Sequence, residues 1–168
     1  MPDALEVVNR IISEHSGIRK HAKLAGDTVN DVEALFTLRR TQSAWDETSV
    51  AALVEKKDQL VQALTLLEQG LANHYRFEEE SFLPLLGDLL ARAIRQEHDD
   101  IASEISRARA TLTGMDLEEI QERGLLSDTP VIQHSIGSIA QAIAEHTRHE
   151  EAILEIMKRA LERENPSS

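Results

Sequence analysis

The chain has 168 residues, enough for a sizeable core, and we expect a single domain over residues 1–168. Its 30 acidic residues outnumber its 18 lysines and arginines, and the net charge of −12 argues against nucleic acid or an anionic membrane as a partner. Cysteine is absent, which excludes disulfides and thiolate chemistry. Because the sequence shows neither an apolar run of roughly 18 residues nor a signal peptide, we expect a cytoplasmic protein.

The composition favours helices throughout. Aromatic residues make up 3% of the chain, and only 7 glycines and 4 prolines interrupt runs rich in alanine, leucine, glutamate and arginine. Apolar residues at three- and four-residue steps predict a first helix over about 5–25. Gly26 predicts a break, and the resumed spacing predicts a further helical piece over about 29–42. The periodicity then lapses around Trp45, which indicates a turn.

The second helix begins near Thr48, a good capping residue, and its leucine-rich stripe continues to Glu78. Pro84 and Gly87 predict its end, because proline disrupts a helix interior and glycine favours the C-terminal cap. A third helix follows from Asp88 to about residue 112.

A loop over 114–128 follows, with one short helical turn expected over 116–123. Thr129 followed by Pro130 is a strong start signal for the last helix, because proline is favoured at the first helical position. The last apolar stripe continues to Leu161.

Four apolar stripes joined by turns predict an all-α fold, an antiparallel up-down-up-down four-helix bundle. The hairpin between residues 15 and 74 is nearly twice as long as the other two. It is therefore expected either to extend past the bundle by roughly 20 Å at 1.5 Å per residue, or to break at Gly26 and fold back as an extra short helix. Its apolar side chains need cover, so we expect a homodimer through residues 29–55.

Two repeated motifs place polar residues on these apolar stripes. The motif H-x-R-x-E-E begins at His74 and again at His146, and the dipeptide Glu-His ends at His15 and again at His98. Residues four apart lie on one face of a helix, and similar chain lengths to the connecting turns place the four histidines at one level. The residues predicted to converge are His15, His74, Glu78, His98, His146 and Glu150.

Six buried polar groups require neutralisation. Leaving one such group unpaired costs roughly 1–3 kcal/mol, whereas a domain of this size has a net stability of about 5–15 kcal/mol. Bound cations would neutralise them. Imidazole and carboxylate together suit iron, manganese or zinc, while calcium and magnesium prefer oxygen ligands alone.

The donor set is too large for one zinc ion, which prefers four ligands. Two carboxylates that each bridge two ions would give each ion two histidine nitrogens and two carboxylate oxygens, and a shared oxide or hydroxide would add a fifth ligand. Each ion would then keep about one open position. We expect it to face a pocket lined by residues such as Phe77, Phe82 and Ile153, suited to a diatomic molecule or a peroxide rather than a bulky substrate.

The pattern His…H-x-x-x-E…His…H-x-x-x-E resembles the hemerythrin-like family of HHE cation-binding domains. The stretch HYRFEEESFLPLL, residues 74–86, is similar to the second-helix motif of that family. The resemblance covers about residues 5–25, 66–112 and 134–160. It implies a non-haem di-iron centre held by the six residues listed above, with Glu78 and Glu150 as bridges.

The resemblance implies a protein that binds or senses O₂ or a related small oxidant, or one that handles iron. The alternative is a di-iron enzyme that acts on peroxide or O₂, of catalase or oxidase type. Two departures from the oxygen carriers bear on this choice. Their third helix has H-x-x-x-H, whereas this chain has Ile94 and Ala102 around His98. Their fourth helix has His and Asp five apart, whereas His146 and Glu150 are four apart.

The missing histidine argues against reversible O₂ carriage. His149 is an alternative source of that nitrogen, although a position behind the ligands or at the surface is favoured. His21 and His134 are expected to be solvent-exposed or to form local hydrogen bonds. Glu79, Glu80 and Glu151 are expected on solvated faces, with a hydrogen-bond acceptor behind the ligands as the alternative for Glu79 or Glu151.

Three other classes compete with this interpretation. A ferritin-like oxidase is disfavoured because the chain contains no Glu-x-x-His. A histidine phosphotransfer bundle is disfavoured because the candidate histidines lie on buried stripes. A metal-free helical interaction module is the third alternative, and metal analysis of the purified protein would distinguish it.

Overall fold

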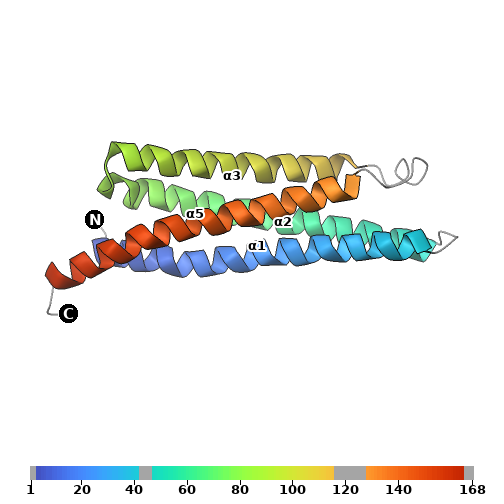
Figure 1. The fold of residues 1–168 in the computed structure, drawn as a ribbon, viewed down its shortest axis with the longest axis horizontal. Helices are drawn as coiled ribbons and strands as arrows, with labels where there is room; N and C mark the ends of the chain where they lie inside the picture. The colour runs from blue at the N-terminus through green and yellow to red at the C-terminus, as the bar shows by residue number, and fades with distance from the viewer. Residues whose placement is uncertain (1–2, 42–46, 116–127, 165–168) are drawn as a thin grey trace.

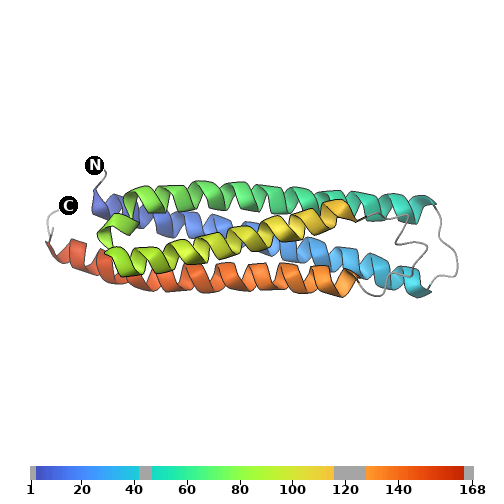
Figure 2. The same ribbon diagram turned by 90° about the horizontal axis from the view of Figure 1, so that it is seen from above.

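The computed structural model describes residues 3–41, 47–115 and 128–164; the side chains of residues 32–41, 47–50 and 128–130 lie outside this description. Over these ranges the chain forms four long helices and one 3-10 helix. They are α1 (Ala4–Thr41), α2 (Glu47–Ser81), η1 (Leu83–Leu85), α3 (Asp88–Gly114) and α5 (Asp128–Glu164). Successive helices run antiparallel along the length of the molecule, as Figures 1 and 2 show. The predicted all-α up-down-up-down bundle is confirmed.

Helix α1 is unbroken from Ala4 to Thr41, so the predicted break at Gly26 is wrong. Glycine in a helix interior costs only about 0.5–1 kcal/mol relative to alanine. Ala25 and Val29 on either side of it are buried in the core, and their packing offsets that cost. Helices α1 and α2 extend past α3 and α5 at the end that carries Thr41 (Figures 1 and 2), as expected for an extended first hairpin.

Two predictions fall on parts of the chain outside the description, one in the outer part of this hairpin and one in the loop before α5. The side chains of residues 32–50, which include most of the apolar residues expected at a dimer interface, lie outside the described part of the chain. Leu53 is described, and it is buried within the chain itself. Residues 116–127, where the sequence predicts a short helical turn, also lie outside the described ranges. The homodimer through residues 29–55 therefore stays a prediction.

The turn between α2 and α3 follows the predicted signals. Helix α2 ends at Ser81, and Pro84 lies in the first turn of η1. Gly87 has a φ of +78° and directly precedes α3, whose first turn carries Asp88. An acidic residue at a helix N-terminus is favoured by the helix dipole.

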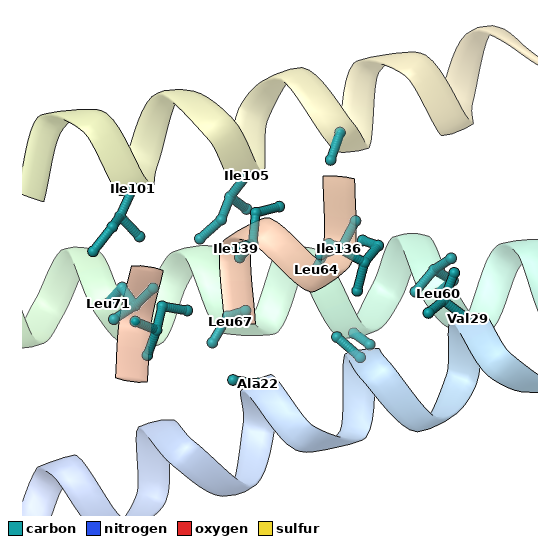
Figure 3. Packing of buried hydrophobic residues seen from close by; sticks show 14 of the residues in the cluster. Ala22, Val29, Leu60, Leu64, Leu67, Leu71, Ile101, Ile105, Ile136 and Ile139 are labelled. Atoms are coloured by element: carbon teal, nitrogen blue, oxygen red, sulfur yellow. The ribbon is translucent and has the colours of Figure 1, made fainter. Parts of the chain in front are cut away.

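Two apolar clusters fill the bundle on either side of the level where the histidines lie. The larger cluster includes Leu64 and Leu67 of α2, which meet Ile105 of α3 and Ile139 of α5 (Figure 3). The smaller cluster surrounds Phe82 near the α2–α3 turn. None of the described helices combines the length and apolar character that a membrane span requires.

Candidate metal centre

All six predicted residues lie together in the interior, between the two apolar clusters. None of their side chains is more than 3% exposed. Each long helix contributes a histidine, and α2 and α5 add the two glutamates one turn further along. The residues are His15 of α1, His74 and Glu78 of α2, His98 of α3, and His146 and Glu150 of α5. The bundle therefore places the histidines at one level, as the chain lengths predict.

These residues form two groups of possible metal donors. Within each group, one donor atom from every residue lies within 4.8 Å of the others. The first group is His15, His74, Glu78 and Glu150, and the second is Glu78, His98, His146 and Glu150. Both glutamates belong to both groups. The arrangement thus offers two adjacent four-residue sites that share two carboxylates.

The spacing of the inward-facing atoms fits shared ions better than direct hydrogen bonds. Each histidine Nε2 lies 3.1–3.4 Å from the nearest carboxylate oxygen of Glu78 or Glu150. Nevertheless, none of these nitrogens or carboxylate oxygens has a hydrogen-bond partner among the described residues. Ligands that lie about 2.1 Å from one ion are themselves about 3–4 Å apart. Orphaned buried donors at this spacing are what a metal site requires.

A second carboxylate lies behind every histidine. The four Nδ1 atoms contact an outer glutamate at 2.8–3.4 Å. The pairs are His74 with Glu14, His146 with Glu97, His15 with Glu151, and His98 with Glu79. An Nδ1–H that donates to a carboxylate leaves Nε2 as the lone-pair nitrogen, so each imidazole is held in the tautomer that binds metal.

The outer glutamates follow a regular order around the bundle. Each one comes from the helix that precedes its histidine in the cycle α5, α1, α2, α3. Glu79 and Glu151, expected mainly on solvated faces, instead take the alternative position behind the ligands. The roles of Glu14 and Glu97 were missed, although the repeated Glu-His dipeptide is a sequence signal for both.

The electrostatics of the site favour the protonated forms of His15 and His98 while no cation is bound. Burial alone would lower the pKa of His15 and His98, but the nearby carboxylates of Glu78 and Glu150 outweigh burial and raise both values to about 9. Burial alone would raise the pKa of Glu78, but the surrounding histidines hold it far below its usual range. Cations entering the site would replace these protons.

Tyr75 is a functional candidate that the sequence pattern missed. It is 6% exposed, and its ring stacks on His98 with 3.7 Å between ring centroids and 9° between planes. It also meets the ring of His146 edge-on at 5.6 Å. Its buried hydroxyl has no hydrogen-bond partner in the described part of the chain. Burial and the charges of Glu78 and Glu150 raise the pKa of Tyr75, so this is a neutral phenol beside the donor groups.

The remaining histidines lie outside both donor groups. His149 is 53% exposed, and its Nδ1 is 3.6 Å from Glu97, so it lies behind the site. His21 and His134 are exposed, as predicted. Nδ1 of His21 donates to the backbone carbonyl of Gly17 at 2.9 Å.

The position of the absent histidine on α3 is now clear. Ile94 is buried in the smaller apolar cluster one turn from His98, whereas Ala102 is exposed. The inward position that could have carried a further imidazole is therefore 94. An isoleucine there supplies no ligand.

Phe77, Phe82 and Ile153, the residues expected to line a pocket, lie in or against the smaller apolar cluster. Phe82 is fully buried and the other two pack against its cluster. The guanidinium of Arg10 covers the Phe77 ring, with its carbon 3.6 Å from the ring centroid. These side chains therefore contribute to the apolar packing at this end of the site.

Two pockets approach the donor groups from the sides of α3. One of about 270 Å³ lies between α3 and α5, and Glu97, His146 and His149 are among its lining residues. The other, of about 300 Å³, lies between α2 and α3. Its lining residues are Ala72, Tyr75, Arg76, Glu79, Glu80, His98, Asp99 and Ala102.

Comparison with known proteins gives one match. The model of the hemerythrin HHE cation binding domain matches residues 6–157, a span that contains all six converging residues. No curated protein and no solved structure matched the chain.

Proposed function

Because the chain belongs to the hemerythrin HHE cation-binding domain family, whose domains bind metal cations, we propose that it holds a non-haem di-iron centre. The observation that carries the proposal is the pair of donor groups that share both glutamates. The proposed ligands are His15 and His74 for one iron, His98 and His146 for the other, and Glu78 and Glu150 for both. An oxide or hydroxide bridge would complete the set, and manganese or zinc suits the same donors.

We propose that the protein binds or senses O₂ or a related small oxidant, or handles iron. When bound, iron supplies a redox-active position to which a small oxidant can bind. The protein contributes the geometry: outer glutamates orient the imidazoles, and the apolar clusters exclude water from both ends of the site. Four histidines and two carboxylates leave a coordination position free for a further small ligand. Residue 94, the inward position where a further histidine could stand, is an isoleucine and supplies no ligand.

Iron content tests the shared-ligand arrangement. The wild-type chain should bind two iron ions. Glu150→Ala should bind fewer than one iron ion per chain on average, because both donor groups depend on this carboxylate. His15→Ala should affect one ion first. Glu155→Ala is the matched control, because Glu155 is exposed on the same helix and pairs only with Arg159. Two ions retained by Glu150→Ala would contradict the shared role.

A di-iron enzyme acting on peroxide is the second candidate, favoured by the buried hydroxyl of Tyr75. A neutral phenol beside the donor groups can provide a proton to an oxidant. Iron-loaded protein that turns over H₂O₂, with the turnover lost in Glu78→Ala and reduced in Tyr75→Phe, would support this candidate. Iron-loaded protein without turnover would leave binding or sensing as its role.

A further inference from the structure

Helices α1 and α2 carry the same pattern of histidines and glutamates as helices α3 and α5. The surroundings of the site in one half of the bundle can therefore be compared with those in the other half. Matching His15 to His98 superposes the pattern of α1 on α3, and matching His74 to His146 does the same for α2 and α5. We use the word seam for the line of contact between two neighbouring helices. With this matching, the seam between α5 and α1 corresponds to the seam between α2 and α3. Both halves supply the same kinds of metal ligand. Residues that differ between the two seams are therefore not needed to form the ligand set.

The seam between α5 and α1 is covered by an arginine. Arg19 donates to Glu151 at 2.5 Å, and the same carboxylate contacts His15. The position that corresponds to Arg19 on α3 is Ala102. With only a methyl group there, the matching seam between α2 and α3 is open.

The arginine that does pair with the matching carboxylate lies elsewhere. Arg95 is 3.8 Å from Glu79, but it is about two turns closer to the start of α3 than Ala102. It does not line the pocket of about 300 Å³ between α2 and α3, whereas Ala102 does. The opening is therefore bordered by Ala102, and the guanidinium of Arg95 does not cover it.

The open seam leads to a polar group that has no partner. Tyr75 and His98 line this pocket, and both are more than nine-tenths buried. The Tyr75 hydroxyl has no hydrogen-bond partner among the described residues. On the covered seam the corresponding residue is Thr147, whose hydroxyl donates to the carbonyl of Ala144 at 3.2 Å. The open seam thus combines a pocket with a buried hydroxyl that has no partner in the described part of the chain.

We propose that the pocket between α2 and α3 is the port by which small neutral oxidants such as O₂ reach the centre, and that Tyr75 is the first buried polar group they meet. This inference rests on the proposed function. The charges at the port favour a neutral molecule over an anion, because the carboxylates of Glu79, Glu80 and Asp99 outnumber the single guanidinium of Arg76.

Dissolved O₂ is the probe that tests the port, and it needs no metal. Tyr75 is the single tyrosine of the chain, so 3-fluorotyrosine gives one ¹⁹F resonance that reports on this ring alone. The ¹⁹F longitudinal relaxation rate of metal-free protein is compared under argon and under O₂. We expect O₂ to raise the rate in the wild type although the ring is buried. Ala102→Arg, which copies the covered seam, should lose most of that increase.

Two further variants separate blocking of the port from other effects. Ala102→Leu should also lose most of the increase, since it fills the opening without adding charge. Ala110→Arg should keep it, because Ala110 is exposed on the same helix and does not line the pocket. A wild-type rate that is insensitive to O₂, or a full increase in both Ala102 variants, would overturn the port.

Iron content of the same variants separates failure of the port from failure of the proposed function. We expect two ions in the wild type and in Ala102→Arg, because Ala102 belongs to neither donor group. If the Ala102 variants bind iron normally and show the same O₂-dependent rate increase as the wild type, only the port is overturned. A wild-type chain that binds no iron would overturn the proposed function and, with it, the role assigned to the port.

Discussion

His15 shows how each imidazole of the centre is fixed from two sides. Its Nε2 lies 3.3 Å from Glu150 in the interior, and its Nδ1 lies 3.3 Å from Glu151 nearer the surface. The two carboxylates are consecutive in the sequence, yet one is fully buried and the other is partly exposed. The inner carboxylate is positioned to bind a cation, while the outer one sets the proton on the ring. Glu150 and Glu151 are chemically identical, and the difference in their burial gives them different roles.

The outer carboxylates should strengthen metal binding without being ligands. Replacing Glu97 with glutamine removes the charge that faces Nδ1 of His146 at 2.9 Å. We expect Glu97→Gln to weaken metal affinity by about 10- to 100-fold, measured by competition with a chelator. Glu104→Gln is the control, because Glu104 lies on the same helix and, among the described residues, forms no ion pair or hydrogen bond with a histidine of the site, although it lines the same pocket as His146. Equal affinities in the two variants would show that the outer carboxylate has no such effect.

The protonation of the site makes the gain from metal binding depend on pH. The pKa values of His15 and His98 are raised from 6.5 to about 9, so the metal-free fold gains stability from their protonation below pH 6.5 and loses it as pH rises towards 9. Metal requires both rings neutral, so its binding releases protons and strengthens over the same range. The Tm difference between metal-loaded and metal-free protein should widen from pH 6.5 to 9. A constant difference would contradict the raised pKa values.

At the scale of the elements, helix α1 is held straight by what it packs against rather than by its local sequence. Gly26 and Asp27 are poor helix formers, and the helix continues through them because buried residues on either side join the larger apolar cluster. The α2–α3 turn differs, because there the backbone conformation itself requires glycine. Gly87 has φ +78° and ψ +161°, a region that is essentially restricted to glycine.

These two glycines give a matched pair of substitutions. A Cβ at either position would meet no atom within 4 Å, so only the backbone conformation distinguishes them. Gly26→Ala should stabilise the protein by about 0.5–1 kcal/mol, since alanine favours the helix. Gly87→Ala should destabilise it by about 1–3 kcal/mol through backbone strain. Urea unfolding measures both, and changes of the same sign would contradict this account.

Periodicity and spacing were sufficient to predict the fold class and the convergence of six side chains. Both depend on the apolar stripe of each helix and on distances along the chain, which a sequence displays directly. The straight course of α1 through Gly26 could not be predicted, because tertiary packing decides it. Tyr75 was missed for a related reason: it follows His74 directly, off the stripe, and only the approach of α3 brings it onto His98.

At the scale of the whole molecule, two similar halves build a nearly symmetric centre with unequal surroundings. The ligands and the outer glutamates repeat from one half to the other, whereas the residues around them do not. Arg10 and Arg19 flank the histidine of α1, and the corresponding positions on α3 are Ala93 and Ala102. The described pockets that reach donor residues accordingly lie beside α3. The repeat builds the proposed metal site, and we propose that the departures from it determine access.

The most direct test of the di-iron proposal is anomalous X-ray diffraction from crystals of the iron-loaded protein at the iron edge. Two peaks are expected between the helices, each beside one pair of histidines, at the separation of about 3.5–4 Å that is typical of two-metal sites. Both peaks should lie within bonding distance of Glu78 and Glu150. A single peak, or peaks outside the level of the four histidines, would contradict the account.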